Sequence, residues 1–235
     1  MPTFSASSTA RLTNRDLGRF PGGTLFHRVA RAVCHAGCLP RKELYEAWEM
    51  AKRVRRLFRG GRVVDLGAAH GLLAHAMLLL DDSSPSAIVV DKSMPPSAGK
   101  VHDVLVDVWP RLAGRVEFVT RGMDDPGVKI SSADIIVSSH ACGALTDVVL
   151  ERAVAARARV AVLPCCHDLA ACDRGELDGW LDGSLSIDVM RAVRLKDQGY
   201  QVWTRSIPVE ITPKNRLLLG APLRDSLPHS RSDGP

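Results

Sequence analysis

The most informative stretch of this 235-residue chain is Val63-Val64-Asp65-Leu66-Gly67-Ala68-Ala69-His70-Gly71. It begins as a short apolar run that ends near an acidic residue, and it continues as a turn with two glycines. The apolar segment 72–80 follows and is long enough for a helix. A buried strand, a tight glycine-containing turn and a helix in this order are typical of a ligand-binding loop at the carboxyl edge of an open α/β sheet.

The chain around this stretch alternates between short apolar runs and longer segments. The runs are rich in Val and Ile and are apolar on both faces, as buried parallel strands are. They lie at residues 62–66, 87–90, 116–119, 134–137 and 160–163. The segments between them that predict helices include 71–80, 101–112 and 145–156. This repetition predicts an open, mostly parallel α/β sheet.

Both ends of the chain differ from this pattern. Residues 24–36 and 41–58 carry apolar residues at helical spacing and predict two helices, after a loosely packed start at 1–19. Residues 200–211 and 216–219 predict two antiparallel strands, joined by a turn at 212–215. The expected domains are a helical extension at 1–59, an α/β domain at 60–223 and a disordered tail at 224–235.

Composition narrows the class of protein. Hydrophobic residues make up 46% of the chain and charged residues 24%, which is ordinary for a globular protein. The net charge of +5 allows a polyanionic partner without requiring one. No apolar stretch approaches the roughly 18 residues of a membrane span. The six cysteines include the adjacent pair Cys165 and Cys166, which suits disulfides poorly, so we expect a reducing, cytoplasmic setting.

Two details separate the first loop from a dinucleotide-binding loop. Asp65 precedes the glycines, and the pattern is Asp-x-Gly-x-x-x-Gly rather than Gly-x-Gly-x-x-Gly. On these residues, segment 60–220 resembles the class I methyltransferases that use S-adenosylmethionine (SAM). The resemblance implies a Rossmann-like, mostly parallel seven-stranded sheet with a C-terminal antiparallel hairpin, preceded here by the N-terminal helices. It also implies SAM as the cofactor, contacted through Asp65, Gly67, Ala69 and Gly71.

A second acid extends the expected cofactor site. Asp91 ends the second apolar run, where a carboxylate can accept hydrogen bonds from both ribose hydroxyls of a nucleoside or can merely cap the following loop. After the third run, the resemblance implies an adenine contact at Met123 and Asp124, with Asp125 as an equal candidate. Ala69 and His70 depart from the residues common in the family, so a protein of this fold without SAM stays an alternative.

Two polar clusters follow the fourth and fifth runs. They are Ser138-Ser139-His140-Ala141-Cys142-Gly143 with Thr146-Asp147, and Pro164-Cys165-Cys166-His167-Asp168. Because parallel strands end at one edge of a sheet, the clusters are expected to meet. Together they resemble the tRNA 2′-O-methyltransferases of the acceptor stem and related methyltransferase-domain proteins. The zinc-binding N-terminal segments of the tRNA enzymes are not found in this sequence, which leaves the substrate open.

The resemblance implies that the clusters hold the methyl acceptor, with catalytic candidates His140, Cys142, Cys165 and His167. Either histidine could act as a base near neutral pH. A cysteine nucleophile, a zinc site that also includes Cys166, and buried cysteines without chemistry are the alternatives. We predict no metal here, and none at Cys34-His35-x-x-Cys38 with His27, where a helix face with a glycine stop is expected.

A basic helix end precedes the first loop. Its cations are Lys52, Arg53, Arg55, Arg56 and Arg59. They could contact RNA phosphates, or they could simply suit the C-terminus of a helix. The sequence therefore predicts a SAM-dependent methyltransferase that acts on RNA such as tRNA, with a small molecule or a protein as the alternative acceptor.

Overall fold

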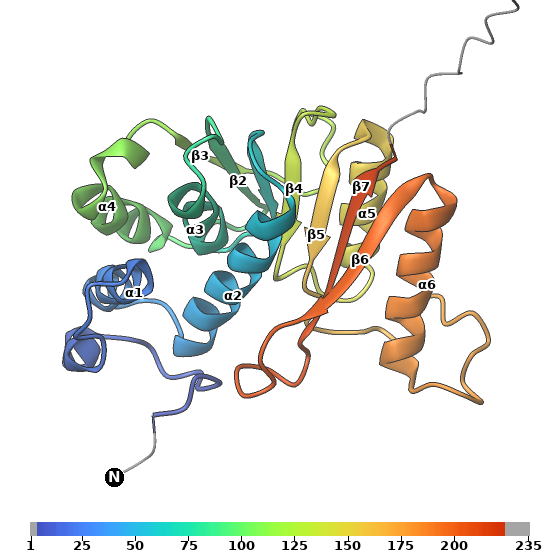
Figure 1. Cartoon of the computed structure of the whole chain (residues 1–235), viewed down its shortest axis with the longest axis horizontal. Coiled ribbons are helices and arrows are strands. Elements are labelled where there is room, and N and C mark those ends of the chain that lie inside the picture. Colours follow the sequence, from blue (N-terminus) through green and yellow to red (C-terminus); the bar gives the residue numbers. More distant parts are fainter. Residues whose placement is uncertain (1–3, 224–235) are drawn as a thin grey trace, which may run out of the picture.

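The computed structural model describes residues 4–223. Seven strands form one sheet in the order β3-β2-β1-β4-β5-β7-β6 (Figure 1). The strands are β1 (Val63–Leu66), β2 (Ala87–Asp91), β3 (Val116–Thr120), β4 (Ile135–Ser138), β5 (Arg159–Val162), β6 (Tyr200–Ser206) and β7 (Arg216–Pro222). The first five are parallel, and β7 runs antiparallel to β5 and β6. The predicted mixed sheet and its closing hairpin are confirmed.

Helices cover both faces of the sheet (Figure 1). They are α1 (Leu25–Ala36), α2 (Arg41–Leu57), α3 (Leu72–Leu80), α4 (Ala98–Val108), α5 (Leu145–Ala156) and α6 (Gly183–Asp197), with short 3₁₀ helices η1 (Asn14–Arg19) and η2 (Pro110–Leu112). Side chains alternate along β1. Val63 packs in the core under α1 to α4, whereas Val64 and Leu66 pack in the core under α5 and α6. This arrangement is a three-layer α/β fold.

The edge strand β3 is less buried than its apolar sequence predicts. All its residues are half-buried or exposed, whereas β1 and β4 are buried along their whole length. β3 pairs only with β2 in the sheet, so its other edge has no neighbouring strand. The sequence of β3 is therefore as apolar as that of a central strand, but its side chains are less buried than those of β1 and β4.

The N-terminal segment is packed rather than loose within the described residues. Leu12 and Phe20 are buried in the same core as α1 and α2. Thr13 and Asp16 form a capping box at the start of η1, in which the Thr13 N–H donates to the Asp16 carboxylate at 3.1 Å. The expectation of a loosely packed start is therefore wrong from residue 4 onward. The domain boundary at residue 59 stays a prediction, and the predicted tail at 224–235 lies outside the described residues.

Two features near the C-terminus differ from the sequence prediction. Helix α6 was not predicted, because its hydrophobic residues do not form a clear stripe. Strand β6 ends at Ser206 rather than at residue 211, so the connection to β7 is a nine-residue loop and not a four-residue turn. Ile207 and Ile211 are buried in the core, which explains why their sequence looks like a strand. Across residues 4–223, none of the helices combines the length and hydropathy needed to cross a membrane.

Candidate functional site

The loop after β1 approaches two other loops at the carboxyl edge of the sheet. Gly67 has a φ of 67°, and a Cβ built on it would lie 3.0 Å from Cε of Met123 and 3.8 Å from the Ala141 nitrogen. A side chain at this position would displace the end of the Met123 side chain, and the positive φ itself favours glycine. Ala69 takes a φ of 47°, which is strained for a residue with a Cβ.

Gly71 has a different role from the one expected. It is the N-cap of α3 with a φ of 71°, and a Cβ built on it would lie 2.8 Å from Cγ2 of Val89. The glycine therefore allows the start of α3 to pack closely on β2. It does not line the cavity described below.

Asp65 is buried beneath this loop, with only 1% of its surface exposed. Its Oδ2 accepts a hydrogen bond from the Ala74 N–H at 3.1 Å, whereas Oδ1 has no partner among the described residues. Burial raises the pKa of this carboxyl to about 7, against the lowering effect of the Ala74 hydrogen bond. An unpartnered buried oxygen is costly, so a donor or a cation brought by a ligand would stabilise it.

Asp91 connects the end of β2 to the first loop. Its Oδ2 accepts the Ala69 N–H at 3.0 Å, and its Oδ1 accepts the Ser93 N–H at 2.9 Å. It therefore both caps the following loop and lies at the cavity wall, so the two interpretations of this acid are compatible. His70, beside Ala69, contacts Oγ of Ser97 at 2.9 Å through Nε2 and so holds the loop from outside.

A cavity of about 470 Å³ opens between these loops. Its lining comes from the carboxyl ends of β1 to β4 and from the start of α5. The lining residues are Gly67, Ala69, Asp91, Lys92, Gly122, Met123, Asp124, His140, Leu145 and Val148. Five predicted site residues meet here: Gly67, Ala69, Asp91, Asp124 and His140.

The lining of the cavity distinguishes Asp124 from Asp125, which the sequence left as equal candidates. Asp124 lines it, whereas Asp125 accepts hydrogen bonds from Arg121 at 3.1 Å and from the Gly127 N–H at 2.6 Å. Lys92, Leu145 and Val148 were not predicted as lining residues. Their positions in the sequence could have indicated this role. Lys92 directly follows Asp91, and Leu145 and Val148 lie one turn apart at the start of a predicted helix.

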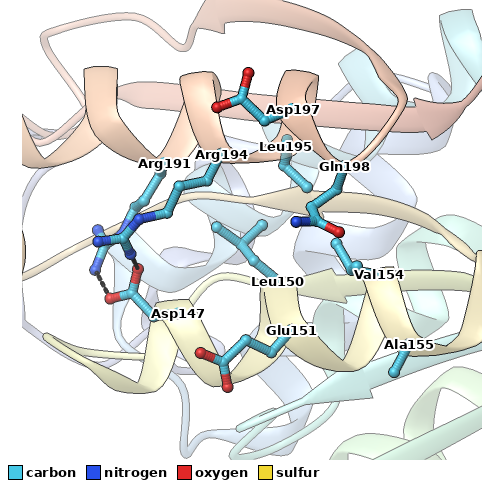
Figure 2. Close-up of a pocket in the computed structure, with 10 residues that line it drawn as sticks. All are labelled: Asp147, Leu150, Glu151, Val154, Ala155, Arg191, Arg194, Leu195, Asp197 and Gln198. Carbon is cyan, nitrogen blue, oxygen red and sulfur yellow. Dashed lines mark hydrogen bonds and ion pairs between the residues drawn. The ribbon is translucent and has the colours of Figure 1, made fainter.

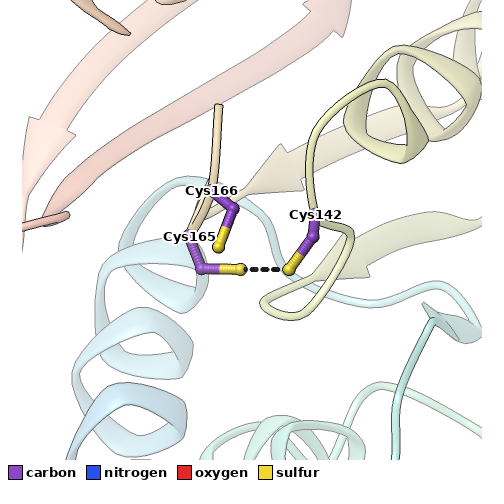
Figure 3. A group of neighbouring side chains, drawn as sticks. All are labelled: Cys142, Cys165 and Cys166. Atoms are coloured by element: carbon purple, nitrogen blue, oxygen red, sulfur yellow. Dashed lines mark hydrogen bonds between the residues drawn. The ribbon is translucent and has the colours of Figure 1, made fainter. Parts of the chain in front are cut away.

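The cysteines of the two polar clusters converge, as Figure 3 shows. Cys142 follows β4, and Cys165 and Cys166 follow β5, and their three Sγ atoms lie within 4.8 Å of one another. The Sγ atoms of Cys142 and Cys165 are 2.8 Å apart. All three are free thiols. The expected meeting of the two clusters is therefore confirmed for the cysteines.

Burial and charge affect these thiols differently. Burial raises the pKa of Cys165 and, more moderately, that of Cys142. Hydrogen bonds from Cys142 and Cys165 lower the pKa of the exposed Cys166, and the Lys214 ammonium lowers it further. Nζ of Lys214 lies 3.6 Å from Sγ of Cys166. Cys166 is thus the thiol whose anion is best stabilised.

The two predicted histidines do not line the same cavity. His140 lines the first cavity, whereas His167 lines a second of about 680 Å³. The second cavity is bounded by Cys142, Gly143, Ala144, Leu145, Val148, Cys166, His167, Asp168 and Leu169. Leu145 and Val148 line both cavities, so the two are neighbours across the first turns of α5.

His167 is held by a residue of the helix that the sequence analysis missed. Its Nε2 lies 2.8 Å from Oδ1 of Asp188 on α6, and the histidine side chain is 6% exposed. Oδ2 of Asp188 accepts a hydrogen bond from Arg216 at 2.7 Å. Burial alone would raise the pKa of Asp188, but the hydrogen bonds from His167 and Arg216 lower it. A carboxylate that orients an imidazole is a frequent arrangement around a general base.

A buried arginine on the same helix holds the loop after β4. Arg191 donates to Asp147 at 2.8 Å and to the Gly143 carbonyl at 2.8 Å. Figure 2 shows the pair Arg191 and Asp147 at one end of a groove of about 420 Å³ between α5 and α6. Apolar residues such as Leu150 and Val154 form its floor. The groove lies along the two helices and includes none of the predicted site residues.

The basic helix end is not uniformly available to a partner. Arg55 is 2% exposed, pairs with Asp81 at 3.2 Å and donates to Oγ of Ser84 at 2.8 Å, so its expected place on the exposed face is wrong. Lys52 pairs with Glu49 at 2.9 Å, and Arg53 also pairs with Glu49. Arg56 and Arg59 are exposed.

This helix end also lies away from the two cavities. The carbonyl of Arg59 accepts a hydrogen bond from Arg159, the first residue of β5, at 2.7 Å. It is therefore at the amino edge of the parallel strands (Figure 1). The two cavities lie at the carboxyl edge.

The segment around Cys34 is a helix face with a glycine stop, as expected. Cys34 is buried, Gly37 takes a φ of 68°, and its N–H donates to the Val33 carbonyl at 3.1 Å. His35 contacts Oδ1 of Asn14 at 3.0 Å. Within residues 4–223, these side chains do not form a group with metal-ligand spacing.

Comparison with known proteins agrees with this geometry. A family model described as a methyltransferase domain matches residues 42–172. No curated protein matches the sequence. Among solved structures, an O-methyltransferase family protein from Burkholderia thailandensis is similar with a TM-score of 0.53 and 18% identity, over 92% of this chain and 64% of that one.

Two further structures have the same fold. A candidate O-methyltransferase from Nostoc punctiforme has a TM-score of 0.52 and 16% identity, over 88% of this chain and 67% of that one. A fibrillarin/Nop5p complex has a TM-score of 0.50 and 12% identity, over 76% of this chain and 84% of that one. This chain thus spans about two thirds of the two O-methyltransferases, at 64% and 67%.

Proposed function

The chain belongs to the methyltransferase-domain family, and we propose that it transfers a methyl group from SAM to an acceptor bound where β4 and β5 end. The class I fold implies SAM as the methyl donor. The observation that carries the proposal is the cavity of about 470 Å³, in which Asp91, Asp124 and His140 meet. Its volume is within the range of small-molecule sites, which is roughly 300–1,000 Å³.

The residues of this cavity fit the chemistry of SAM. Gly67 leaves open a space that a Cβ would fill, and Asp91 offers carboxylate lone pairs to ribose hydroxyls. The unpartnered Oδ1 of Asp65 lies beneath the same loop and would interact favourably with the positive charge of the methionine part, directly or through water. When bound, SAM supplies an electrophilic methyl group.

The acceptor is proposed to bind in the neighbouring cavity of about 680 Å³. Leu145 and Leu169, at 43% and 51% exposure, give this cavity an apolar rim. No lysine or arginine is among its lining residues in the described chain, and Asp168 adds a negative charge. This lining favours a small molecule or a protein side chain with apolar surface over a phosphate-rich acceptor.

His167 is proposed to accept the proton that the acceptor loses. Its Nε2 contacts Asp188, which leaves Nδ1 for the acceptor. A positioned base contributes roughly 10²–10⁴-fold to such a transfer. His167→Asn and Asp188→Asn should therefore lower kcat and change its pH profile, while the KM for SAM stays unchanged. Equal losses in kcat and in the SAM affinity would contradict this role and indicate a structural one.

RNA is the second candidate acceptor, because Arg56 and Arg59 are exposed near the end of α2. These cations lie at the opposite edge of the sheet from the cavities, so an RNA would have to reach around the domain to use both. RNA binding that weakens with salt and is lost in Arg56→Ala/Arg59→Ala would support this candidate. Arg55 is unsuitable for such a test because it is buried.

The deciding experiment incubates the full chain with methyl-labelled SAM and separate RNA, protein and metabolite fractions of a cell extract. Label in the metabolite or protein fraction is expected, and it should fall strongly with Asp91→Ala when the SAM concentration is low. Label in RNA alone would replace the first acceptor class by the second. Absence of transfer to every fraction, with SAM binding retained in calorimetry, would contradict the proposed activity.

A further inference from the structure

Three thiols that are far apart in sequence gather at one place in this fold. Cys142 comes from the loop after β4, and Cys165 and Cys166 come from the segment after β5 (Figure 3). Their Sγ atoms all lie within 4.8 Å of one another. The parallel pairing of β4 with β5 produces this convergence, because it ends both strands at the same edge.

The spacing suits one metal ion bound by all three sulfurs. A Zn–S bond is about 2.3 Å, so tetrahedral geometry places two sulfur ligands about 3.8 Å apart. None of the three Sγ pairs is more than 4.8 Å apart, so none has to close by more than about an ångström to reach that separation. Cys142 and Cys165, at 2.8 Å, would have to move apart by about an ångström, and the exposed loop position of Cys142 permits such a shift.

The surroundings also fit a metal thiolate. Three thiolates and one divalent cation carry a net charge of minus one, and Nζ of Lys214 lies 3.6 Å from Sγ of Cys166 to offset it. Cys142 and Cys166 line the cavity of about 680 Å³, so the cluster is open on that side. His167 also lines the cavity, but neither of its ring nitrogens belongs to the group of ligand atoms within 4.8 Å of one another.

We propose that Cys142, Cys165 and Cys166 form a zinc-binding site with three protein ligands and a fourth position that opens into the acceptor cavity. Three protein ligands with an open position are typical of zinc sites that bind an exchangeable ligand. The site differs from the one weighed from sequence, because neither His140 nor His167 is a ligand. It does not depend on the proposed methyl transfer.

Titration of the reduced, metal-free full chain with Co²⁺, as a spectroscopic substitute for Zn²⁺, tests the site. We expect sulfur-to-cobalt charge-transfer absorption and the strong visible bands of four-coordinate cobalt, saturating at about one equivalent and reversed by Zn²⁺. Cys142→Ser, Cys165→Ser and Cys166→Ser should each weaken the affinity at least about tenfold. Cys38→Ser, at a half-buried thiol outside the cluster, should leave it unchanged.

Several outcomes would overturn the proposal. They are a wild-type titration without charge-transfer bands, bands of equal strength in all three cluster variants, and loss of the bands in Cys38→Ser. The wild-type titration needs no variant to fold, and far-UV circular dichroism identifies any variant that does not. Asp91→Ala separates this site from the proposed function, because it should weaken SAM binding and retain the cobalt bands.

Discussion

The backbone N–H of Ala69 donates a hydrogen bond of 3.0 Å to Oδ2 of Asp91. This contact joins the loop after β1 to the end of β2, and it stabilises the strained φ of 47° at Ala69. The second oxygen of Asp91 accepts the Ser93 N–H at 2.9 Å. One carboxylate therefore shapes two loops of the cavity in which we propose that SAM binds.

Asp91→Ala should lower the affinity for SAM by about 10- to 160-fold, since a hydrogen bond to a charged group contributes about 1.5–3 kcal/mol. Isothermal titration calorimetry measures this change. Asp107→Ala, at an exposed acid of α4, is the matched control and should bind SAM normally. Unchanged affinity in Asp91→Ala would remove the basis for placing the ribose at this residue.

The buried Asp65 should make stability depend on pH. Its pKa is raised from 3.8 to about 7 in the folded protein, so the folded state holds a proton that the unfolded state has already released between those values. Stability from this group is therefore greatest below pH 4, falls as pH rises and levels off above pH 7. Asp65→Asn removes the effect.

Thermal unfolding without ligand, measured from pH 5 to about 8, checks this prediction. The difference in Tm between Asp65→Asn and the wild type should grow in favour of the variant as the pH rises. Taking the difference cancels the buried His75, whose pKa is lowered to about 4 by burial and which contributes in the opposite direction. Parallel Tm curves would contradict a raised pKa at Asp65.

Gly71→Ala should destabilise the fold by roughly 2–4 kcal/mol, from a left-handed backbone and an overpacked contact. The added Cβ would lie 2.8 Å from Cγ2 of Val89. Gly99→Ala is the control, because its Cβ would meet nothing within 4 Å and it lies in helix α4. Urea unfolding should show a loss for the first variant and a small gain for the second. A neutral Gly71→Ala would mean that α3 is not packed as described.

Arg55→Ala should cost roughly 2–4 kcal/mol, because it removes the buried arginine nearest to Asp81 and leaves this carboxylate only the exposed and more distant Arg59 at 3.8 Å. The two side chains are 2% and 6% exposed and lie 3.2 Å apart. The exposed neighbour Arg56 provides the control, and Arg56→Ala should change the free energy of unfolding by less than about 0.5 kcal/mol. Similar free energies of unfolding for the two variants would show that the Arg55 ion pair is not structural.

Much of the cofactor side of the site could be predicted from local sequence. The ends of the predicted strands locate Asp65, Asp91 and the glycines of the first loop. An apolar run followed by an acid and a turn is compatible with few structures other than a buried strand and its loop. The position of Gly71 was predicted, but its role was not. Its contact with Val89 depends on how closely α3 lies to β2, and no local pattern reports that distance.

The acceptor side depended much more on the tertiary structure. His167 and Asp188 are 21 residues apart in the sequence, and helix α6 brings them into contact. No clear hydrophobic stripe in the sequence predicts this helix. Arg55 looks like its basic neighbours in the sequence, yet its helical position turns it into the core toward Asp81. Burial and pairing are properties of the assembled layers, so identical residue types in one segment can have opposite environments.

By itself, the sequence determined the strands and all the α-helices of the described chain except α6, because hydrophobic periodicity and glycine positions are local properties of the chain. It also determined that two cysteine-bearing segments follow neighbouring strands. Only the tertiary structure decided that Cys142, Cys165 and Cys166 meet while His140 and His167 face different cavities. The distance between side chains on separate strands depends on register, twist and loop path, and these are set when the whole sheet packs.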